Sequence, residues 1–270
     1  MPKVLVGNVE SYEKVEKFIE KVYETFGFKK CSYLKPNLLK FKDPANGCIT
    51  HPEVIKAILK CAKEHGDELT VIEGGFYKYT AKKCFEAFGL NELAKCINLN
   101  EEEFLEVEIN GKALKSVKMA KTAVEARNKF ISVPKLKVHH KTIVTIGIEN
   151  NMGFLKKPAI YMHPRISQKL VDLLHFTSPP LTIVDGIIGG NGSESSTVPL
   201  KHGVMVASDD VVACDFVCAK LMGFNPRSIK HIRLAMKTFG ISEDKIEIEG
   251  DLIVKKYSLS LFNRIFGRFI

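Results

Sequence analysis

The sequence predicts an α/β fold: a mostly parallel, Rossmann-like sheet with helices on both faces and a small antiparallel β insert. Short apolar runs alternate with amphipathic helical stretches in the first part of the chain, which is typical of a parallel sheet with packed helices. A hairpin pattern then interrupts this alternation, and apolar strands return after it. We expect one interwoven domain over residues 1–257 with the insert at about 98–128, because no linker rich in Pro, Gly or Ser divides the chain.

The first elements follow from apolar spacing. Residues 3–7 form a short apolar strand, and residues 11–26 carry apolar side chains at the period of a helix. A second strand covers 30–34 and ends in a polar loop.

The next helix has a clear start and stop. Thr50 is predicted to be its N-cap, Pro52 suits the first turn, and Glu53 completes a capping box. Gly66 ends the helix. The third strand, 69–73, follows at once, so this part of the chain reads β-α-β-α-β.

The middle of the chain changes character. Residues 103–118 read as two strands joined by Asn110 and Gly111, a strong signal for a two-residue hairpin turn. An apolar strand returns at 129–133, and a helix is expected over 141–150.

The last part predicts further strands and helices. Strands are expected at 181–185 and 203–207. Helices are expected at 209–222 and 226–240, and a glycine ends each of these two helices. Residues 245–254 offer one or two closing strands.

The charge balance is basic. Forty Lys and Arg stand against 31 Asp and Glu, giving a net charge of +9 and a pI of about 9.1. A lysine-rich surface explains this, and so does an anionic partner or substrate. No zinc-finger spacing or aromatic RNA-binding signature is present, so we expect no specific nucleic-acid binding.

The cellular setting is predicted from cysteines and apolar runs. Seven cysteines cannot all pair within the chain, and none form Cys-x-x-Cys. No export signal and no run of eighteen apolar residues is visible, so we expect a cytoplasmic protein without a transmembrane segment.

Polar residues and glycines follow five of the predicted strands. In an open parallel sheet, the carboxyl ends of the strands share an edge where ligands bind. The sequence therefore predicts a polar crevice for a small anionic ligand. The residues expected to take part are His51, His139, Lys135 and Asp185 as catalytic groups, Lys35, Asn37, Lys137, Asn150, Asn151 and Gly190 as substrate-binding groups, and Glu73 and Asp185 as ligands of a divalent metal.

Two of these segments have a plain alternative. Residues 133–141 hold three lysines and two histidines that could bind a carboxylate or phosphate, but a solvated loop would have the same composition. Residues 186–192 contain four glycines, which suit either backbone contact with an anion or a long mobile loop.

The C-terminal tail, 258–270, is apolar with two arginines. A membrane surface is one partner for such a segment. Docking on the core, on a second copy in a homodimer or on a partner protein is the interpretation we prefer.

Seven short blocks resemble the domain of unknown function 362 family in order and spacing. They are KPNL at 35–38, THPEV at 50–54, VIEGG at 71–75, VPKLKVH at 133–139, ENNMG at 149–153, IVDG at 183–186 and ASDD at 207–210.

The resemblance implies an α/β protein whose function is mostly uncharacterised. Many relatives carry a ferredoxin-like segment, but this chain has no Cys-x-x-Cys-x-x-Cys run, so no iron–sulfur cluster is expected. The chain has Glu73 where the family usually has aspartate, and Glu149 where it usually has lysine. A looser likeness to nickel-dependent lactate racemases is an analogy of fold class and site composition.

Two functions from different classes follow. In the first, the protein is an enzyme: lysines 35, 135 and 137 bind an anion, His51 or His139 moves a proton, and Glu73 and Asp185 hold a metal or orient the base. In the second, it is a non-catalytic binding or accessory protein for a metal or redox centre supplied by a partner.

Overall fold

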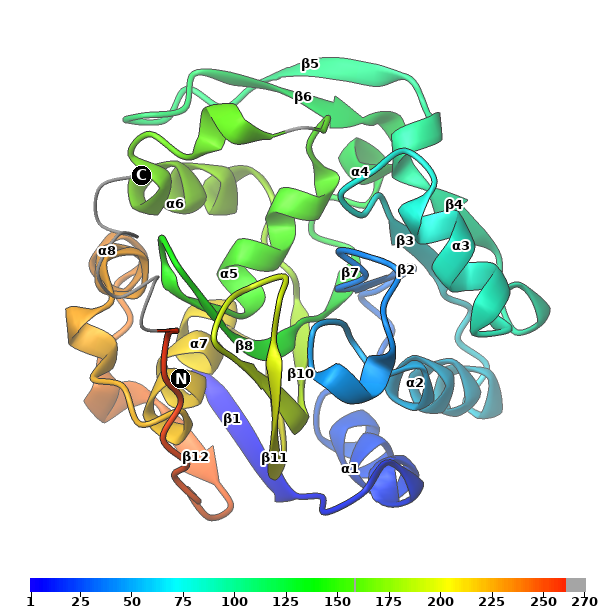
Figure 1. Ribbon diagram of the computed structural model, residues 1–270, viewed down its shortest axis with the longest axis vertical. Coiled ribbons are helices and arrows are strands. Elements are labelled where there is room, and N and C mark those ends of the chain that lie inside the picture. The colour runs from blue at the N-terminus through cyan, green and yellow to red at the C-terminus, as the bar shows by residue number, and fades with distance from the viewer. Residues whose placement is uncertain (158, 261–270) are drawn as a thin grey trace.

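A large mixed sheet crosses the molecule, with helices packed on both of its faces (Figure 1). The computed structural model describes residues 1–157 and 159–260. The sheet contains β1 (Lys3–Asn8), β2 (Tyr33–Pro36), β3 (Thr70–Glu73), β4 (Cys96–Asn98), β7 (Phe130–Val133), β8 (Lys135–His139), β9 (Ile143–Thr145), β10 (Leu181–Asn191), β11 (Val198–Ser208) and β12 (Glu247–Glu249). A separate two-stranded sheet consists of β5 (Phe104–Glu108) and β6 (Ser116–Ala120).

The strand order is β12-β1-β11-β10-β7-β2-β3-β4. Strands β10, β7, β2, β3 and β4 are parallel neighbours, whereas β11 runs antiparallel to both β1 and β10. Beyond the end of β7, β8 pairs with β10 in parallel and with β9 in the antiparallel sense. The predicted α/β class, with its mostly parallel sheet and small antiparallel insert, is confirmed.

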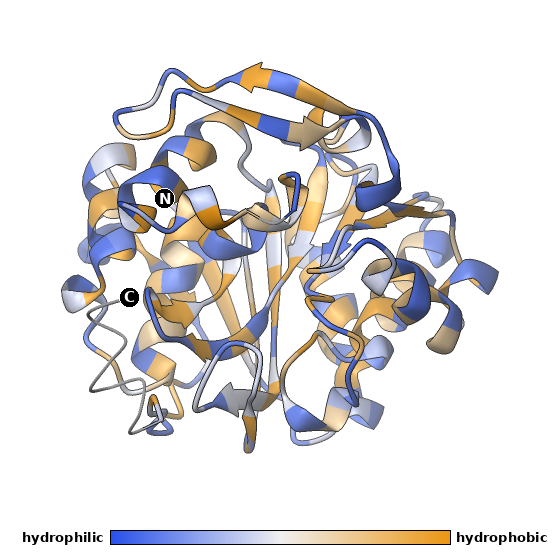
Figure 2. Cartoon of the chain, turned by 45° about the horizontal axis from the view of Figure 1, so that its top comes forward, coloured by the Kyte–Doolittle hydropathy of each residue, from blue (hydrophilic) through white to orange (hydrophobic). Residues whose placement is uncertain are grey.

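Side-chain alternation along the strands produces two apolar layers. Leu34, Val71 and Ile131 point to one face, where α1 (Val15–Phe26), α2 (Pro52–Glu64) and α3 (Thr80–Ala87) supply the rest of the core. Ile72 and Phe130 point to the opposite face, against α6 (Ile166–Phe176) and its neighbours. Apolar residues accordingly concentrate along the strands in Figure 2, and hydrophilic residues gather on the outer turns of the helices.

The helices are α1 (Val15–Phe26), α2 (Pro52–Glu64), α3 (Thr80–Ala87), α4 (Lys121–Glu125), α5 (Gly147–Asn150), α6 (Ile166–Phe176), α7 (Val211–Leu221) and α8 (Lys230–Phe239). None of the helices in the described residues is long and apolar enough to cross a membrane.

The N-cap of α2 is His51, and the prediction of Thr50 is wrong. The Nδ1 atom of His51 accepts a hydrogen bond from the backbone N–H of Glu53. Thr50 is buried instead and joins two strand ends: its hydroxyl accepts from the N–H of Asn37 and donates to the carbonyl of Val133. The Thr50 hydroxyl therefore forms hydrogen bonds with distant segments of the chain and does not cap α2.

Three other local predictions also change. No long helix covers 141–150, because β9 occupies its first part and α5 is a single turn. The glycine segment 186–192 is not a mobile loop, since β10 continues through Asn191. In the 245–254 range, the described residues form one strand, β12.

The β5–β6 hairpin falls inside the predicted insert, but its turn is longer than two residues. Asn110 has a positive φ of 54°, and the loop closes through hydrogen bonds from Ile109 to Lys115 and from Gly111 to Leu114. Of the predicted tail, 261–270 lies outside the described residues.

A buried carboxylate on α6 holds this loop. Asp172 accepts hydrogen bonds from the backbone N–H groups of Ala113 and Leu114 at 2.6 and 2.9 Å, and from Gln168. Burial acts to raise the pKa of Asp172, but these hydrogen bonds outweigh it and hold the pKa below its ordinary value of 3.8.

We therefore predict that Asp172→Ala lowers the free energy of unfolding by about 2 kcal/mol at pH 7, because two backbone donors lose a charged acceptor. A carboxylate with a depressed folded-state pKa stabilises the protein above about pH 4, and this contribution disappears as pH falls through that pKa. Urea unfolding at pH 7 and pH 3 measures both effects. Asp251→Ala, at an exposed position, is the control; equal losses in the two variants would contradict the prediction.

Candidate functional site

A cavity of about 300 Å³ lies beside the carboxyl ends of β2 and β3 and along β8. Twelve of its lining side chains are ionisable or amide groups, and ten of these are Lys35, Asn37, Lys40, Glu73, Lys137, His139, His140, Glu149, Asn150 and Lys157. Glu194 and His163 complete the polar wall, and Leu39, Phe76, Met152 and Ile160 supply apolar surface.

Strand β8 supplies a row of polar side chains to one face. Lys135, Lys137 and His139 alternate with Leu136 and Val138, which pack into the apolar core on the other face. Lys135, Lys137 and His139 are 0%, 1% and 6% exposed. The solvated-loop alternative for this segment is thus excluded.

Lys35 and Glu73 form a buried ion pair at the end of β2 and β3. The Lys35 Nζ lies 2.9 Å from Glu73 Oε2, and both residues are almost fully buried. Glu73 Oε1 also accepts from the backbone N–H groups of Gly74 and Gly75. Burial raises the pKa of Glu73, but Lys35 and these hydrogen bonds outweigh it, so the pKa lies below its ordinary value and the carboxylate stays charged.

The hydrogen-bond acceptors of Lys137 in the described part of the chain are neutral. Its Nζ donates to Asn37 Oδ1 at 3.1 Å and to the carbonyl of Cys48 at 2.9 Å. Asn37 in turn donates to Asn150 Oδ1, which also accepts from Lys35. Among the described residues, no carboxylate oxygen lies within ion-pair distance of Lys137.

Lys157 and Glu149 face the same cavity with shifted pKa values. Lys157 Nζ donates to the carbonyl of Met152, and burial lowers its pKa to about 8. Burial also raises the pKa of Glu149 above its ordinary value, although Lys137 and Lys157 draw it downward. Both residues are therefore able to change charge nearer to neutral pH than in water.

His139 is a neutral donor. Its Nδ1 accepts hydrogen bonds from the backbone N–H groups of Lys141 and Thr142, so the ring proton resides on Nε2. Burial lowers the pKa of His139 to about 3. The Nε2–H group is 3.8 Å from Glu149 Oε1.

Next to it, the Nδ1 atom of His140 lies 2.8 Å from Glu194 Oε2. Burial acts to raise the pKa of Glu194, but the hydrogen bond from His140 outweighs it and lowers the pKa to about 2. Glu194 reaches the cavity from the segment between β10 and β11.

The structure divides the predicted site into two groups. Lys35, Asn37, Glu73, Lys137, His139 and Asn150 line the cavity. The other predicted residues lie elsewhere: Lys135, Asp185, His51, Asn151 and Gly190 are not part of its wall.

Lys135 and Asp185 form a second buried ion pair, at 2.7 Å. The Tyr12 hydroxyl accepts from Lys135 and donates to Asp185, and the backbone N–H of His51 donates to the same carboxylate. The His51 ring stacks on Tyr12 at 3.6 Å. Burial lowers the pKa of Lys135 and of His51.

Asn151 and Gly190, predicted to bind substrate, contact other parts of the protein interior. Asn151 is fully buried and donates to the carbonyl of Thr177. Gly190 lies in the β10 ladder, where an added Cβ would meet the Gly47 carbonyl oxygen at 2.5 Å and the Lys137 Cβ at 2.9 Å. Glycine there lets the backbone of Gly47 approach the strand.

Several cavity residues were not among the sequence candidates: Lys40, His140, Glu149, Lys157, His163 and Glu194. Glu149 stands in the ENNMG block, and His140 follows His139, so a local signal existed for these two. Lys157 and Glu194 come from segments without a helical or strand pattern, and only the tertiary structure brings them to the cavity.

Two groups of side chains could ligate the predicted divalent metal. Glu73 and Asp185 belong to separate ion pairs, and every carboxylate oxygen of both accepts hydrogen bonds. His139, His140 and Glu194 bring potential ligand atoms within 4.8 Å of one another. The Nδ1 atom of His139 is already an acceptor, and its Nε2 carries the proton, so this imidazole is poorly prepared to ligate a metal.

Comparison with known proteins places these elements in a family. Residues 33–220 match the family model described as Domain of unknown function (DUF362). Over 227 residues the chain is 28% identical to the thylakoid-associated protein sll1697 of Synechocystis sp. (strain ATCC 27184 / PCC 6803 / Kazusa), an alignment that covers 80% of this chain and 70% of that protein. The family match includes β2, β3, β8 and α5, which carry Lys35, Glu73, Lys137 and Glu149. The resemblance expected from the seven blocks is confirmed, and the chain belongs to the DUF362 family.

Proposed function

We propose that this protein is an enzyme that binds a small anionic substrate in the cavity and transfers a proton to or from it. The observation that carries the proposal is the placement of Lys137 and Lys157 around Glu149. Both lysines line the cavity with neutral acceptors as their hydrogen-bond partners, and both influence the charge of Glu149. A buried cation without a carboxylate partner is costly, and a bound anion would compensate it.

The volume and composition of the cavity limit the substrate. About 300 Å³ corresponds to a small molecule. A carboxylate or phosphate would lie between the lysines, and the apolar side chains of Met152 and Ile160 would contact a short carbon skeleton.

Glu149 is the best placed acid–base group. Its raised pKa brings its ionisation nearer to neutral pH, so the carboxylate can take up a proton from the bound substrate and the resulting carboxyl can return one. An anion bound beside it would raise that pKa further, because two negative charges repel. His139 is the better hydrogen-bond donor, since its neutral ring presents Nε2–H and its low pKa disfavours uptake of a second proton.

In this scheme the Lys135–Asp185 pair stabilises the strand that lines the cavity. Lys135 and Lys137 share one face of β8, so the pair fixes the strand that presents Lys137 and His139. We assign Lys135, Asp185 and His51 positioning roles. A divalent metal is not required for the proton transfer described.

The anion site is tested with Lys137→Gln. We expect inorganic phosphate and a panel of small mono- and dicarboxylates to include ligands that raise the melting temperature of the wild type. Loss of the Lys137 charge should weaken the best of these by at least about tenfold, as expected for removal of a charge-assisted contact.

Isothermal titration measures the affinities, with the exposed Lys237→Gln as the matched control. Circular dichroism verifies that both variants fold. Equal affinity of the Lys137 variant and the wild type would contradict the anion site.

Anion affinity should also depend on Lys157. Because the pKa of Lys157 is about 8, its positive charge is present below that pH and is lost above it. Binding should therefore weaken as pH rises from 7 to 9. Lys157→Arg keeps its charge over this range and should remove the step. Measuring anion affinity against pH in the wild type and in Lys157→Arg tests this prediction. An identical pH dependence in the two proteins would assign the loss of affinity to another group.

Proton transfer is tested by exchange of substrate hydrogen with solvent. Small 2-hydroxy and 2-oxo carboxylates that bind are incubated with the protein in D₂O, and NMR follows deuterium incorporation at carbon. We expect exchange with the wild type and a loss of at least about a hundredfold in Glu149→Gln, the range of general acid–base catalysis, while the variant retains anion binding.

Binding without exchange in the wild type would instead favour a non-catalytic binding protein. Unchanged exchange in the Glu149 variant would remove Glu149 from the mechanism.

A further inference from the structure

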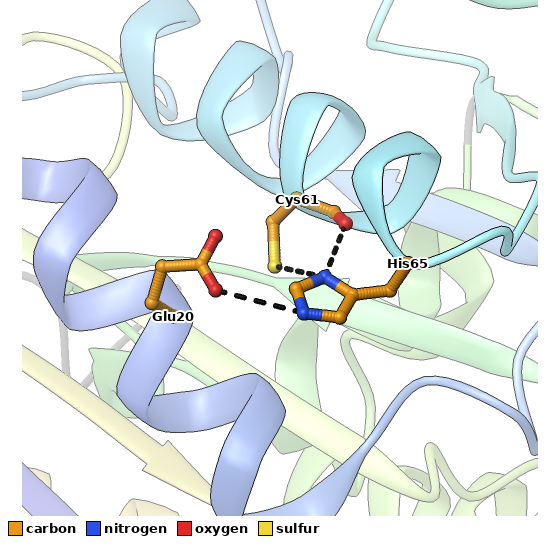
Figure 3. Close-up of side chains that lie close together, drawn as sticks. All are labelled: Glu20, Cys61 and His65. Atoms are coloured by element: carbon orange, nitrogen blue, oxygen red, sulfur yellow. Dashed lines mark hydrogen bonds and ion pairs between the residues drawn. The ribbon is translucent and has the colours of Figure 1, made fainter.

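Three potential metal ligands meet between α1 and α2, on the helical layer outside the cavity. Glu20 lies on α1, Cys61 lies on α2, and His65 follows as the C-cap residue of α2 (Figure 3). Cys61 and His65 are four residues apart, so they share one face of the helix. Their ligand atoms and a Glu20 oxygen all lie within 4.8 Å of one another.

The His65 ring is oriented as in a metal ligand. Its Nδ1 is 2.9 Å from the backbone carbonyl of Cys61, and a carbonyl only accepts, so Nδ1 carries the proton. In the neutral ring the lone pair is then on Nε2, which faces Glu20 Oε2 at 3.9 Å. A histidine that ligates a metal commonly donates its other N–H to a backbone carbonyl in this way. Tyr23 stacks on the ring at 3.9 Å and fixes its plane.

The surroundings of Cys61 favour a cation. Cys61 is 3% exposed, and its Sγ is 3.9 Å from His65 Nδ1. Burial raises the pKa of this thiol to about 12, and the negative charges of Glu20, Glu64 and Asp67 add to the effect. The same negative charges attract a divalent cation, whose own charge would deprotonate the thiol.

We propose that Glu20, Cys61 and His65 form a binding site for a zinc-class divalent cation that joins α1 to α2. A tetrahedral ion with bonds of about 2.1 Å to nitrogen and oxygen and about 2.3 Å to sulfur holds its ligand atoms about 3.4 to 3.7 Å apart. Glu20 Oε2 lies 3.9 Å from His65 Nε2, and one ligand atom from each of the three residues lies within 4.8 Å of the others, so side-chain movements of about 1 Å reach this geometry.

Binding exchanges one bond for another at sulfur. The S–H bond of Cys61 is replaced by a metal–sulfur bond, the proton passes to solvent, and the oxidation state of the metal does not change. Water completes the fourth position, because His65 is exposed and Glu20 is half-exposed. The bound ion stabilises the packing of α1 on α2, because only the folded state brings Glu20 to Cys61 and His65.

Cobalt(II) is the probe, since it occupies zinc sites and gives a near-ultraviolet charge-transfer band only when a thiolate ligates it. The full chain is freed of metal with a chelator, kept reduced and titrated with Co²⁺. We expect a band that saturates at one ion per chain in the wild type and in Cys96→Ser, a control at a half-buried cysteine on β4. Cys61→Ser should remove the band.

Glu20→Gln provides a second variant that preserves the thiol and the buried packing. It should retain the band but weaken Co²⁺ affinity by at least about tenfold, in line with the loss of a metal contact. The cavity cluster of His139, His140 and Glu194 has no sulfur, so it cannot produce this band. Absence of the band in the wild type, its persistence in Cys61→Ser, or wild-type affinity in Glu20→Gln would each overturn the proposal.

Discussion

The burial of three lysines at the strand ends is the constraint on which the site depends. Lys35, Lys135 and Lys137 are each at most 1% exposed, and removing an ammonium group from water costs several kcal/mol. Glu73 compensates Lys35, and Asp185 compensates Lys135. Each carboxylate is also fixed by backbone N–H groups, so neither pair can separate without leaving buried donors and a buried charge.

Lys137 differs from the other two in having amide and carbonyl oxygens as partners. This arrangement keeps the ammonium group hydrogen-bonded at the cavity wall, while no carboxylate of the described residues lies within ion-pair distance of it. The network from Lys137 through Asn37 and Asn150 to Lys35 connects it with the Lys35–Glu73 pair. In the proposed function, one set of hydrogen bonds would therefore couple substrate binding to the stability of the strand ends.

The two helical layers contribute different residues to the molecule. The layer of α1 and α2 encloses an apolar core and carries the Glu20, Cys61 and His65 cluster between the two helices. On the opposite face, α5 presents Glu149 and Asn150, and Asp215 of α7 holds the start of that short helix by accepting from the N–H groups of Gly147 and Ile148. The chemical groups of the cavity thus rest on secondary structure from distant parts of the sequence.

The amino-acid sequence by itself determined the fold class, the α1 and α2 regions, most strand positions, the family blocks and six residues of the cavity wall. These features depend on periodicity and on polar residues that directly follow strands, which are local properties. The extents of β8 and β10 were not predicted, because lysines and glycines give no strand signal until another strand pairs with them.

Only the tertiary structure decided which of the candidates share the cavity. Lys135 and Lys137 are two residues apart on one strand. Lys135 is nevertheless paired with Asp185 outside the cavity wall, whereas Lys137 lines that wall. Glu149, Lys157 and Glu194 reach the same space from separate segments of the chain. Charge pairing depends on distances across strands and loops, and the sequence order of the residues does not contain those distances.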